Sequence, residues 1–198
     1  MAFWTDAENK DPKRGFRFLV IMGNMENGAT WYAKGVNKPS ITVNEESHKF
    51  LGHTFYYPGS VEWGEVSVTL VDPVSPDAAA NTAAILRGSG YSPPADVNDT
   101  TTISKQAATT ALGGVTIQQI DSLGNMIEKW TLWNAFVTGV EYGELAYDSE
   151  ALTEVTVKLR YDWAVLETAN ASNAPVKTPR GVSLAGQKAF FKPGQSDE

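Results

Sequence analysis

Hydrophobic and polar residues alternate most regularly over residues 154–163. Apolar side chains occupy every second position there, and polar or charged side chains lie between them. The apolar set is Val155, Val157, Leu159, Tyr161 and Trp163. This period of two predicts a half-buried β-strand. Residues 136–142 alternate in the same way, and the acidic, turn-forming segment 144–151 separates the two, so we predict an antiparallel pair of strands.

Further strands are predicted elsewhere in the chain from their apolar residues, which over residues 18–22 occupy both faces. We expect them over residues 14–22, 29–36, 61–72, 115–120 and 126–133. Asn27-Gly28 suits a tight turn between the first two, and a five-residue turn joins the last two. The apolar phase of the strand over 61–72 shifts at Gly64, which indicates a β-bulge there.

Between these strands, a polar patch divides the segment 39–59. Residues 44–49 are mostly polar or charged, and β-rich sequences flank them on both sides. This arrangement predicts a long hairpin that projects from the body of the protein.

One helix is predicted over residues 75–87. Ser75 is placed to cap it, Pro76 suits the first helical position, and Gly88 ends it. The segment 89–114 is rich in Gly, Ser, Pro, Asp, Asn and Thr, which predicts a long loop inserted into the fold.

The predicted fold is therefore mainly β. We expect two packed antiparallel sheets that form a β-sandwich or barrel, flanked by one α-helix and followed by an extended C-terminal tail. The domain spans residues 14–167, between an N-terminal arm (1–13) and the tail (168–198). At 198 residues, two full domains are not expected.

Composition narrows the functional classes. Lys and Arg total 16 against 23 Asp and Glu, for a net charge of −7, which argues against a nucleic-acid-binding surface. There is no cysteine, so disulfides, thiolate metal sites and a cysteine nucleophile are excluded, and a reducing cytoplasm suits the chain. The longest purely apolar run, residues 18–22, is too short to span a bilayer, and no signal peptide is expected.

The segment 143–163 resembles a known family. A Gly-Glu-Leu sequence precedes an acidic turn, and a Thr-Glu-Val-Thr-Val strand ends in Tyr-Asp-Trp. This pattern is similar to that of the tail tube proteins of contractile-tailed (myovirus-type) bacteriophages, which are related to the tubes of tailocins and type VI-like injection systems. The segment 11–18 resembles the entry to the family's first strand, and the order of elements agrees over residues 11–167.

The resemblance implies a structural protein of the virion. Six copies would form a ring, and rings would stack into a hollow tube that conducts DNA during ejection, inside a contractile sheath. The implied partners are further copies of the chain, the tail sheath protein, baseplate and tail-terminator proteins, and the tape measure protein and DNA in the lumen. The tube would lie in the virion, after assembly in the host cytoplasm, and no membrane is involved.

Within that expectation, two groups of residues are candidates for tube contacts. The predicted ring-to-ring contacts are the N-terminal arm and Asn44, Glu45, Glu46, Ser47, His48 and Lys49. The acidic residues expected to face the lumen are Asp121, Glu128 and Glu141. A negatively charged bore would let DNA slide, because it offers phosphates no cations to bind.

No catalytic, cofactor or metal site is expected. His48 and His53 are the only histidines, and a metal would need further ligands at matching spacing. No Gly-x-Ser-x-Gly sequence supports a Ser-His-Asp triad, and the acidic residues near 141–148 suit a solvated turn better than a glycosidase pair. Two alternatives stay open: the tube of a tailocin or secretion-type injection device, and a β-sandwich carbohydrate-binding module that uses some of the six tryptophans.

Overall fold

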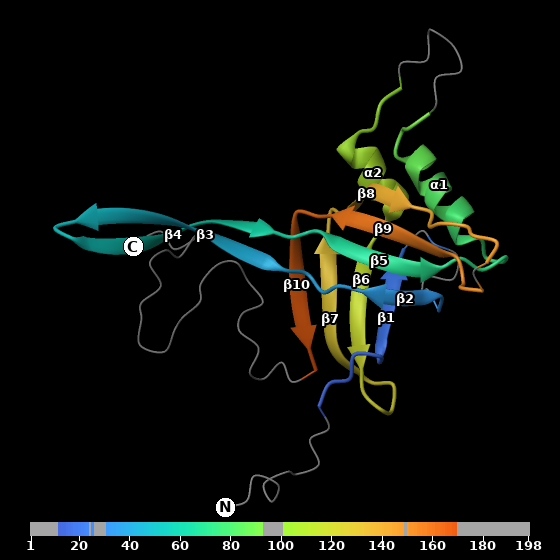
Figure 1. Cartoon of the computed structure of the whole chain (residues 1–198), viewed down its shortest axis with the longest axis horizontal. Helices are drawn as coiled ribbons and strands as arrows, with labels where there is room; N and C mark the ends of the chain where they lie inside the picture. The colour runs from blue at the N-terminus through green and yellow to red at the C-terminus, as the bar shows by residue number, and fades with distance from the viewer. Residues whose placement is uncertain (1–11, 24, 26–30, 93–100, 149, 170–198) are drawn as a thin grey trace, which may run out of the picture.

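The computed structural model describes residues 12–23, 25, 31–92, 101–148 and 150–169 (Figure 1). Ten β-strands and two α-helices lie within these residues. The predicted turn at Asn27-Gly28 lies outside the described residues, as do residues 1–11 of the predicted arm and 170–198 of the predicted tail.

Two four-stranded antiparallel sheets form the body. Sheet 1 has the strand order β1-β6-β7-β10, and sheet 2 has the order β2-β5-β9-β8. Sheet 1 consists of β1 (Phe18–Met22), β6 (Val115–Ile120), β7 (Met126–Trp133) and β10 (Trp163–Thr168). Sheet 2 consists of β2 (Ala33–Val36), β5 (Val66–Val71), β9 (Glu154–Arg160) and β8 (Phe136–Glu141).

The sheets pack face to face as a sandwich, and the strands of one run across those of the other in Figure 1. This confirms the predicted packed antiparallel sheets, although neither sheet closes into a barrel. Two predicted hairpins are also confirmed, because β8 pairs with β9 and β6 pairs with β7.

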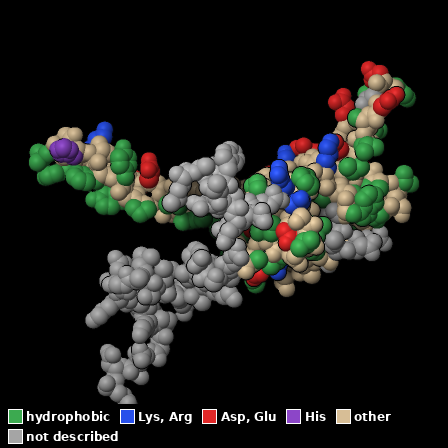
Figure 2. All heavy atoms as spheres, turned by 90° about the horizontal axis from the view of Figure 1, so that it is seen from below, with side chains coloured by type: hydrophobic (Ala, Val, Ile, Leu, Met, Phe, Trp, Pro, Cys, Tyr) green, Lys and Arg blue, Asp and Glu red, His purple; other side chains and the backbone are tan. Residues whose placement is uncertain are grey.

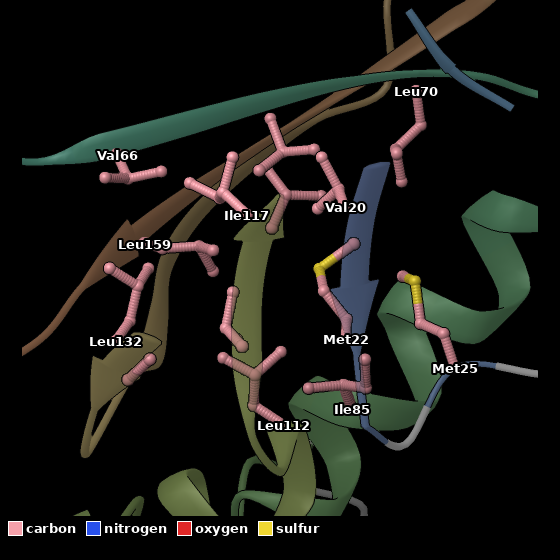
Figure 3. Close-up of a cluster of buried hydrophobic side chains, with 14 of the residues drawn as sticks. Val20, Met22, Met25, Val66, Leu70, Ile85, Leu112, Ile117, Leu132 and Leu159 are labelled. Carbon is pink, nitrogen blue, oxygen red and sulfur yellow. The ribbon is translucent and has the colours of Figure 1, made fainter. Parts of the chain in front are cut away.

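The core lies between the inward faces of the two sheets (Figure 3). Alternate residues of each strand supply it, as their period of two requires. The fully buried strand residues are Val20, Met22, Val115, Val66, Val68, Leu70, Val155, Val157 and Leu159. Ile85 and Leu112, which come from the two helices, close one end of this cluster.

A third, two-stranded sheet is formed by β3 (Ile41–Phe50) and β4 (His53–Trp63). It extends away from the sandwich, as predicted, but it is longer than the segment 39–59. The predicted single strand over 61–72 is wrong, because β4 ends at Trp63 and β5 begins at Val66 in a different sheet. The shift in apolar phase at Gly64 marks this change of sheet and not a bulge within one strand.

Gly64 lies where the chain passes from one sheet to the next. Its N–H donates a hydrogen bond to the Ser40 carbonyl at 2.9 Å. A Cβ atom at Gly64 would lie 2.1 Å from the Ser40 hydroxyl oxygen, so a larger residue here would require the exposed Ser40 side chain to rotate away.

The predicted helix exists but begins later than expected. It is α1 (Ala78–Gly88), and its N-cap is Asp77 and not Ser75. The Asp77 carboxylate accepts a hydrogen bond from the Ala80 N–H at 2.7 Å, and Asp72 accepts one from the Ala78 N–H at 3.0 Å. Two carboxylates therefore satisfy the first N–H groups of the helix, which makes the Ser75 hydroxyl unnecessary as a cap.

The segment 89–114 is not simply a loop, because it contains a second helix, α2 (Lys105–Leu112). Ser104 caps this helix by accepting a hydrogen bond from the Ala107 N–H at 3.2 Å. Ala108 and Leu112 are buried one turn apart. The expectation of a single flanking helix was therefore wrong, since two short helices pack side by side at one end of the sandwich (Figure 1).

Candidate assembly interface

The β3–β4 hairpin is exposed over nearly its whole length. Every residue of β3 is exposed, and β4 is exposed except at Trp63, which packs partly against the core. A two-stranded hairpin with no sheet or helix against it is at best marginally stable in water. The described part of the chain does not supply such a covering surface.

Large apolar side chains line this hairpin. The exposed set is Ile41, Val43, Phe50, Leu51, Phe55, Tyr56, Tyr57 and Val61. Monomeric soluble proteins rarely expose so many contiguous apolar side chains, and such patches mark interaction surfaces. The sequence carried a signal for this surface, since three consecutive aromatic residues at 55–57 cannot all face one core from a β-strand.

The predicted ring-contact residues, Asn44 to Lys49, all lie in β3 and are all exposed. Asn44 has a role within the hairpin, because its side-chain amide donates hydrogen bonds to Ser60 Oγ at 3.2 Å and to Glu62 Oε1 at 3.1 Å. His48 lies opposite Phe55 in the ladder. Sequence reasoning therefore found the segment but missed the apolar residues that surround it.

Both sheets of the sandwich have open edges. In sheet 1 the outer strands are β1 and β10, and in sheet 2 they are β2 and β8. Within the described residues, each of these strands is paired along one side only. Open edges can pair with strands of another chain, so they are a second feature suited to assembly.

Asp121, the first lumen candidate, lies at the start of the exposed turn between β6 and β7. Its carboxylate accepts hydrogen bonds from the N–H groups of Leu123 at 2.7 Å and Asn125 at 2.8 Å. The hydrogen bond from the Asn125 side chain contributes most to lowering the pKa of Asp121. The residue therefore holds the turn together while it keeps a surface charge.

Glu128, the second candidate, is not on the surface of this chain. It is 6% exposed and lies beside Trp130, whose indole N–H donates to it at 2.6 Å. Lys38 Nζ lies 2.8 Å from the carboxylate, and Lys13 pairs with the other oxygen. Burial alone would raise the pKa of Glu128. Hydrogen bonds from Lys13, Lys38 and Trp130 outweigh this effect and lower that pKa to about 2.

Glu141, the third candidate, lies at the end of β8 on the outward face of sheet 2. It forms an ion pair with Lys158 of the neighbouring strand β9. The hydrogen bond to Glu141 raises the pKa of Lys158. The structure therefore does not bring the three acidic candidates together: one caps a turn, one is buried, and one is paired on the other sheet.

The outward face of sheet 1 is mostly uncharged. Thr116, Gln118 and Thr131 alternate with core residues and so face outward. Lys129 and Glu167 lie opposite each other, 3.7 Å apart, and cancel in charge. At one end of this face Trp133 and Trp163 stack with ring centroids 6.2 Å apart, and both are about half exposed. Trp163 therefore does not belong to the core, although its alternation with Val155, Val157 and Leu159 predicted an inward-facing side chain.

The described residues contain no cluster of three metal-ligating side chains. His48 and His53 lie near the hairpin tip, on opposite strands. In the same part of the chain, no helix is long and apolar enough to cross a membrane.

No protein-family model matches the chain, and no curated protein matches its sequence. Several solved structures do match. A chain in the sheath–tube complex of an extracellular contractile injection system, PVC in its extended state, gives a TM-score of 0.60 at 15% identity, over 85% of this chain and 99% of that chain. A chain in the tube-terminating cap of the anti-feeding prophage gives 0.58 at 19% identity, over 85% of this chain and 100% of that chain.

A chain in the baseplate of the same prophage, in a six-fold symmetrised structure, gives a TM-score of 0.56 at 19% identity, over 80% of this chain and 97% of that chain. At these identities the likeness establishes the fold. The chain therefore has the fold of the tube proteins of contractile injection systems.

Proposed function

We propose that this chain is a structural, non-enzymatic subunit of a hollow tube. In this proposal six copies form a ring, and rings stack into a tube inside a contractile sheath. The observation that carries the proposal is the exposed β3–β4 hairpin, whose apolar side chains need a partner. The fold shared with chains of contractile injection systems supports the choice of a further copy as that partner.

The proposed machine is a contractile phage tail. The tube would conduct DNA during ejection, with the tape measure protein in its lumen before that, and would contact sheath, baseplate and tail-terminator proteins. The similar chains occur in complexes whose descriptions name a sheath, a baseplate and a tube-terminating cap, which supports partners of these kinds. The virion is the proposed location, after assembly in the host cytoplasm.

A second candidate machine keeps the tube but changes its cargo. The solved structures cited above come from an extracellular contractile injection system and an anti-feeding prophage, and this observation favours an injection device. The content of native particles distinguishes a phage tail from an injection device. Nuclease-protected DNA in intact native particles would support the phage tail, and particles without a genome would support the injection device.

The open edges of sheet 1 suggest how a ring closes. Pairing of β1 with β10 of the next copy would join the sheets into a continuous wall and remove both edges. Glu141 is exposed and Asp121 is partly exposed, and both stay our candidates for bore charges. Glu128 is buried and paired with two lysines, which leaves it little charge to present. The ring-to-ring contact is proposed to involve the N-terminal arm and the segment 44–49, in which Glu46 and His48 lie on the same face as Tyr57 and Phe55.

Sedimentation velocity over a range of protein concentrations tests self-assembly. The proposal predicts species of six chains and larger, whose proportion grows with concentration. A carbohydrate-binding module would instead stay monomeric and bind insoluble polysaccharide in a pull-down. Monomers that bind polysaccharide would therefore contradict the proposal.

A further inference from the structure

The apolar side chains of the hairpin change faces between its base and its tip. At the base, the opposed pairs Ile41 with Trp63 and Val43 with Val61 share one face. At the tip, Phe50 lies opposite His53, Phe55 opposite His48, and Tyr57 opposite Glu46. Positions 41 and 43 are odd on β3, whereas 46, 48 and 50 are even, so the two groups lie on opposite faces of the ribbon.

A β-bulge produces this change on the second strand. Val43 pairs with Val61 and Glu45 pairs with Pro58, so β4 carries one residue more than β3 between these pairs. Phe55, Tyr57 and Val61 all have odd numbers and would share one face of a regular strand. Pro58 lacks an N–H to donate, and a Cβ atom at Gly59 would approach the Asn44 carbonyl oxygen to 3.1 Å, so both residues suit the irregular position.

The twist of the ribbon compensates for this change of face. Two-stranded ribbons twist more than larger sheets, and a bulge adds to the twist. In Figure 1, β3 and β4 cross between base and tip, so the ribbon turns over along its length. The bulge moves the apolar side chains to the other face of the ribbon, and the twist turns that face around. Together the two effects keep the apolar side chains of base and tip on the same side of the hairpin. Figure 2 shows hydrophobic side chains gathered along one long side of the projecting hairpin.

We propose that this apolar side lies lengthwise along a second copy of the chain, rather than that the tip alone inserts into a partner. We call it the docking side, formed by Ile41, Val43, Val61, Tyr57, Phe55 and Phe50. The opposite side carries Thr42 and Glu62 at the base, and Ser47, Lys49, Thr54 and a single aromatic residue, Tyr56, at the tip. The inference rests on the proposed function and specifies how its main contact is made.

The area of the docking side agrees with one partner. Its residues are 48–60% exposed, so each aromatic side chain, of ~150–250 Å² in total, leaves roughly 100 Å² free to be buried. With the three aliphatic side chains, the docking side offers on the order of 500 Å², against ~800 Å² per partner in a standard interface. This area supplies most of one interface and is too small for two.

The predicted contact residues 44–49 divide between the two sides of the hairpin. Glu46 and His48 share the docking face of the tip, opposite Tyr57 and Phe55. Glu45, Ser47 and Lys49 lie on the other face, and so does Tyr56, which is opposite Ser47. The polar patch is therefore not a single contact surface.

Single-cysteine labelling tests the docking side, because the chain contains no cysteine of its own. Val61→Cys, Tyr57→Cys and Phe55→Cys report on the docking side, and Thr42→Cys, Ser47→Cys and Thr54→Cys are matched positions on the opposite side. Each variant is mixed as a small minority with unaltered chain, so that assembly does not depend on the substituted residue. Maleimide labelling rates are compared in dilute and in assembled protein, with assembly followed by sedimentation.

Assembly should slow labelling at positions 55, 57 and 61 by at least about tenfold and leave positions 42, 47 and 54 nearly unchanged. Protection at 55 and 57 without protection at 61 would show tip insertion and overturn the inference. Equal protection on both sides, or on neither, would also overturn it while leaving a self-assembling subunit intact. A chain that never sediments as more than a monomer would overturn this inference and the proposed function together.

Discussion

At the scale of single residues, Glu128 shows what the sequence could and could not reveal. Glu128, Trp130 and the buried Leu132 are every second residue of β7 and therefore lie on one face. The alternation alone thus predicts that this carboxylate faces inward. Its partners could not be foreseen, because Lys13 and Lys38 lie 115 and 90 residues away in sequence. A carboxylate on the inward face of a strand therefore predicts an internal ion pair better than it predicts a residue that lines the lumen.

Glu128→Gln should lower stability at neutral pH by about 2 kcal/mol, because it leaves two lysines without their buried counter-charge. The pKa of Glu128 in the folded protein, about 2, lies below its ordinary value of 4.5. The ionised carboxylate therefore stabilises the fold fully above about pH 5, and this contribution is lost as the pH falls towards 2. Urea unfolding at pH 7 and pH 3 measures the difference between the two proteins at each pH.

The gap in stability between the original chain and Glu128→Gln should narrow at pH 3. Glu144→Gln, at an exposed carboxylate, is the control and should change stability little at either pH. A gap that stays constant between pH 7 and pH 3 would contradict the assigned ion pair.

At the scale of elements, alternation predicted that strands exist but not where one ends and the next begins. The predicted strand over 154–163 is wrong in its extent, because β9 ends at Arg160 in sheet 2 and β10 begins at Trp163 in sheet 1. Helix boundaries were not predictable either. The α1 boundary depends on Asp72, a residue six positions before the helix that reaches its first N–H group. α2 was missed because Ala and Thr fill most of it, so only Ala108 and Leu112 reach the buried side. Its capping serine, Ser104, was the usable signal.

Asp77→Ala should destabilise the protein by about 1 kcal/mol, because it removes the acceptor of the Ala80 N–H. Ser75→Ala is the matched substitution, since Ser75 is exposed and does not cap the helix. It should change the free energy of unfolding by less than about 0.5 kcal/mol. Chemical denaturation of both variants decides between the two caps, and a larger loss for Ser75→Ala would restore the boundary expected from sequence.

The hairpin should contribute to assembly and little to the fold of one subunit. The double substitution Phe55→Ser with Tyr57→Ser removes exposed aromatic area, so the thermal midpoint of the dilute protein should stay within a few degrees of the original. The proportion of large species in sedimentation should fall at least about tenfold. Ser47→Ala with Thr54→Ala, on the opposite side of the tip, should leave assembly intact. Loss of the folded monomer in the first variant would show that the hairpin is part of the core.

At the scale of the whole molecule, the order of elements was predictable but their arrangement was not. Sheet 1 joins β1 to β6 and β7 to β10, and sheet 2 joins β2 to β5 and β5 to β9. These pairings connect segments far apart in the chain, and no local pattern specifies them. The division of residues 61–72 between two sheets has the same cause, because hydrophobic phase reveals which side faces inward but not which strand lies alongside.

The whole molecule also combines a closed core with surfaces that are incomplete in one copy. The sandwich buries its apolar residues between two sheets, whereas nothing among the described residues covers the hairpin or the four outer strand edges. A ring-forming subunit would cover the hairpin with the next copy.

Electron microscopy of the purified chain at increasing concentration is the decisive test of self-assembly into a hollow tube. We expect rings with an open centre and six-fold symmetry, and stacks of these rings with uniform width at higher concentration. Phe55→Ser with Tyr57→Ser should show few or none of these particles on the same grids. Single sandwiches at every concentration, or solid aggregates without a bore, would contradict assembly of this chain into a tube.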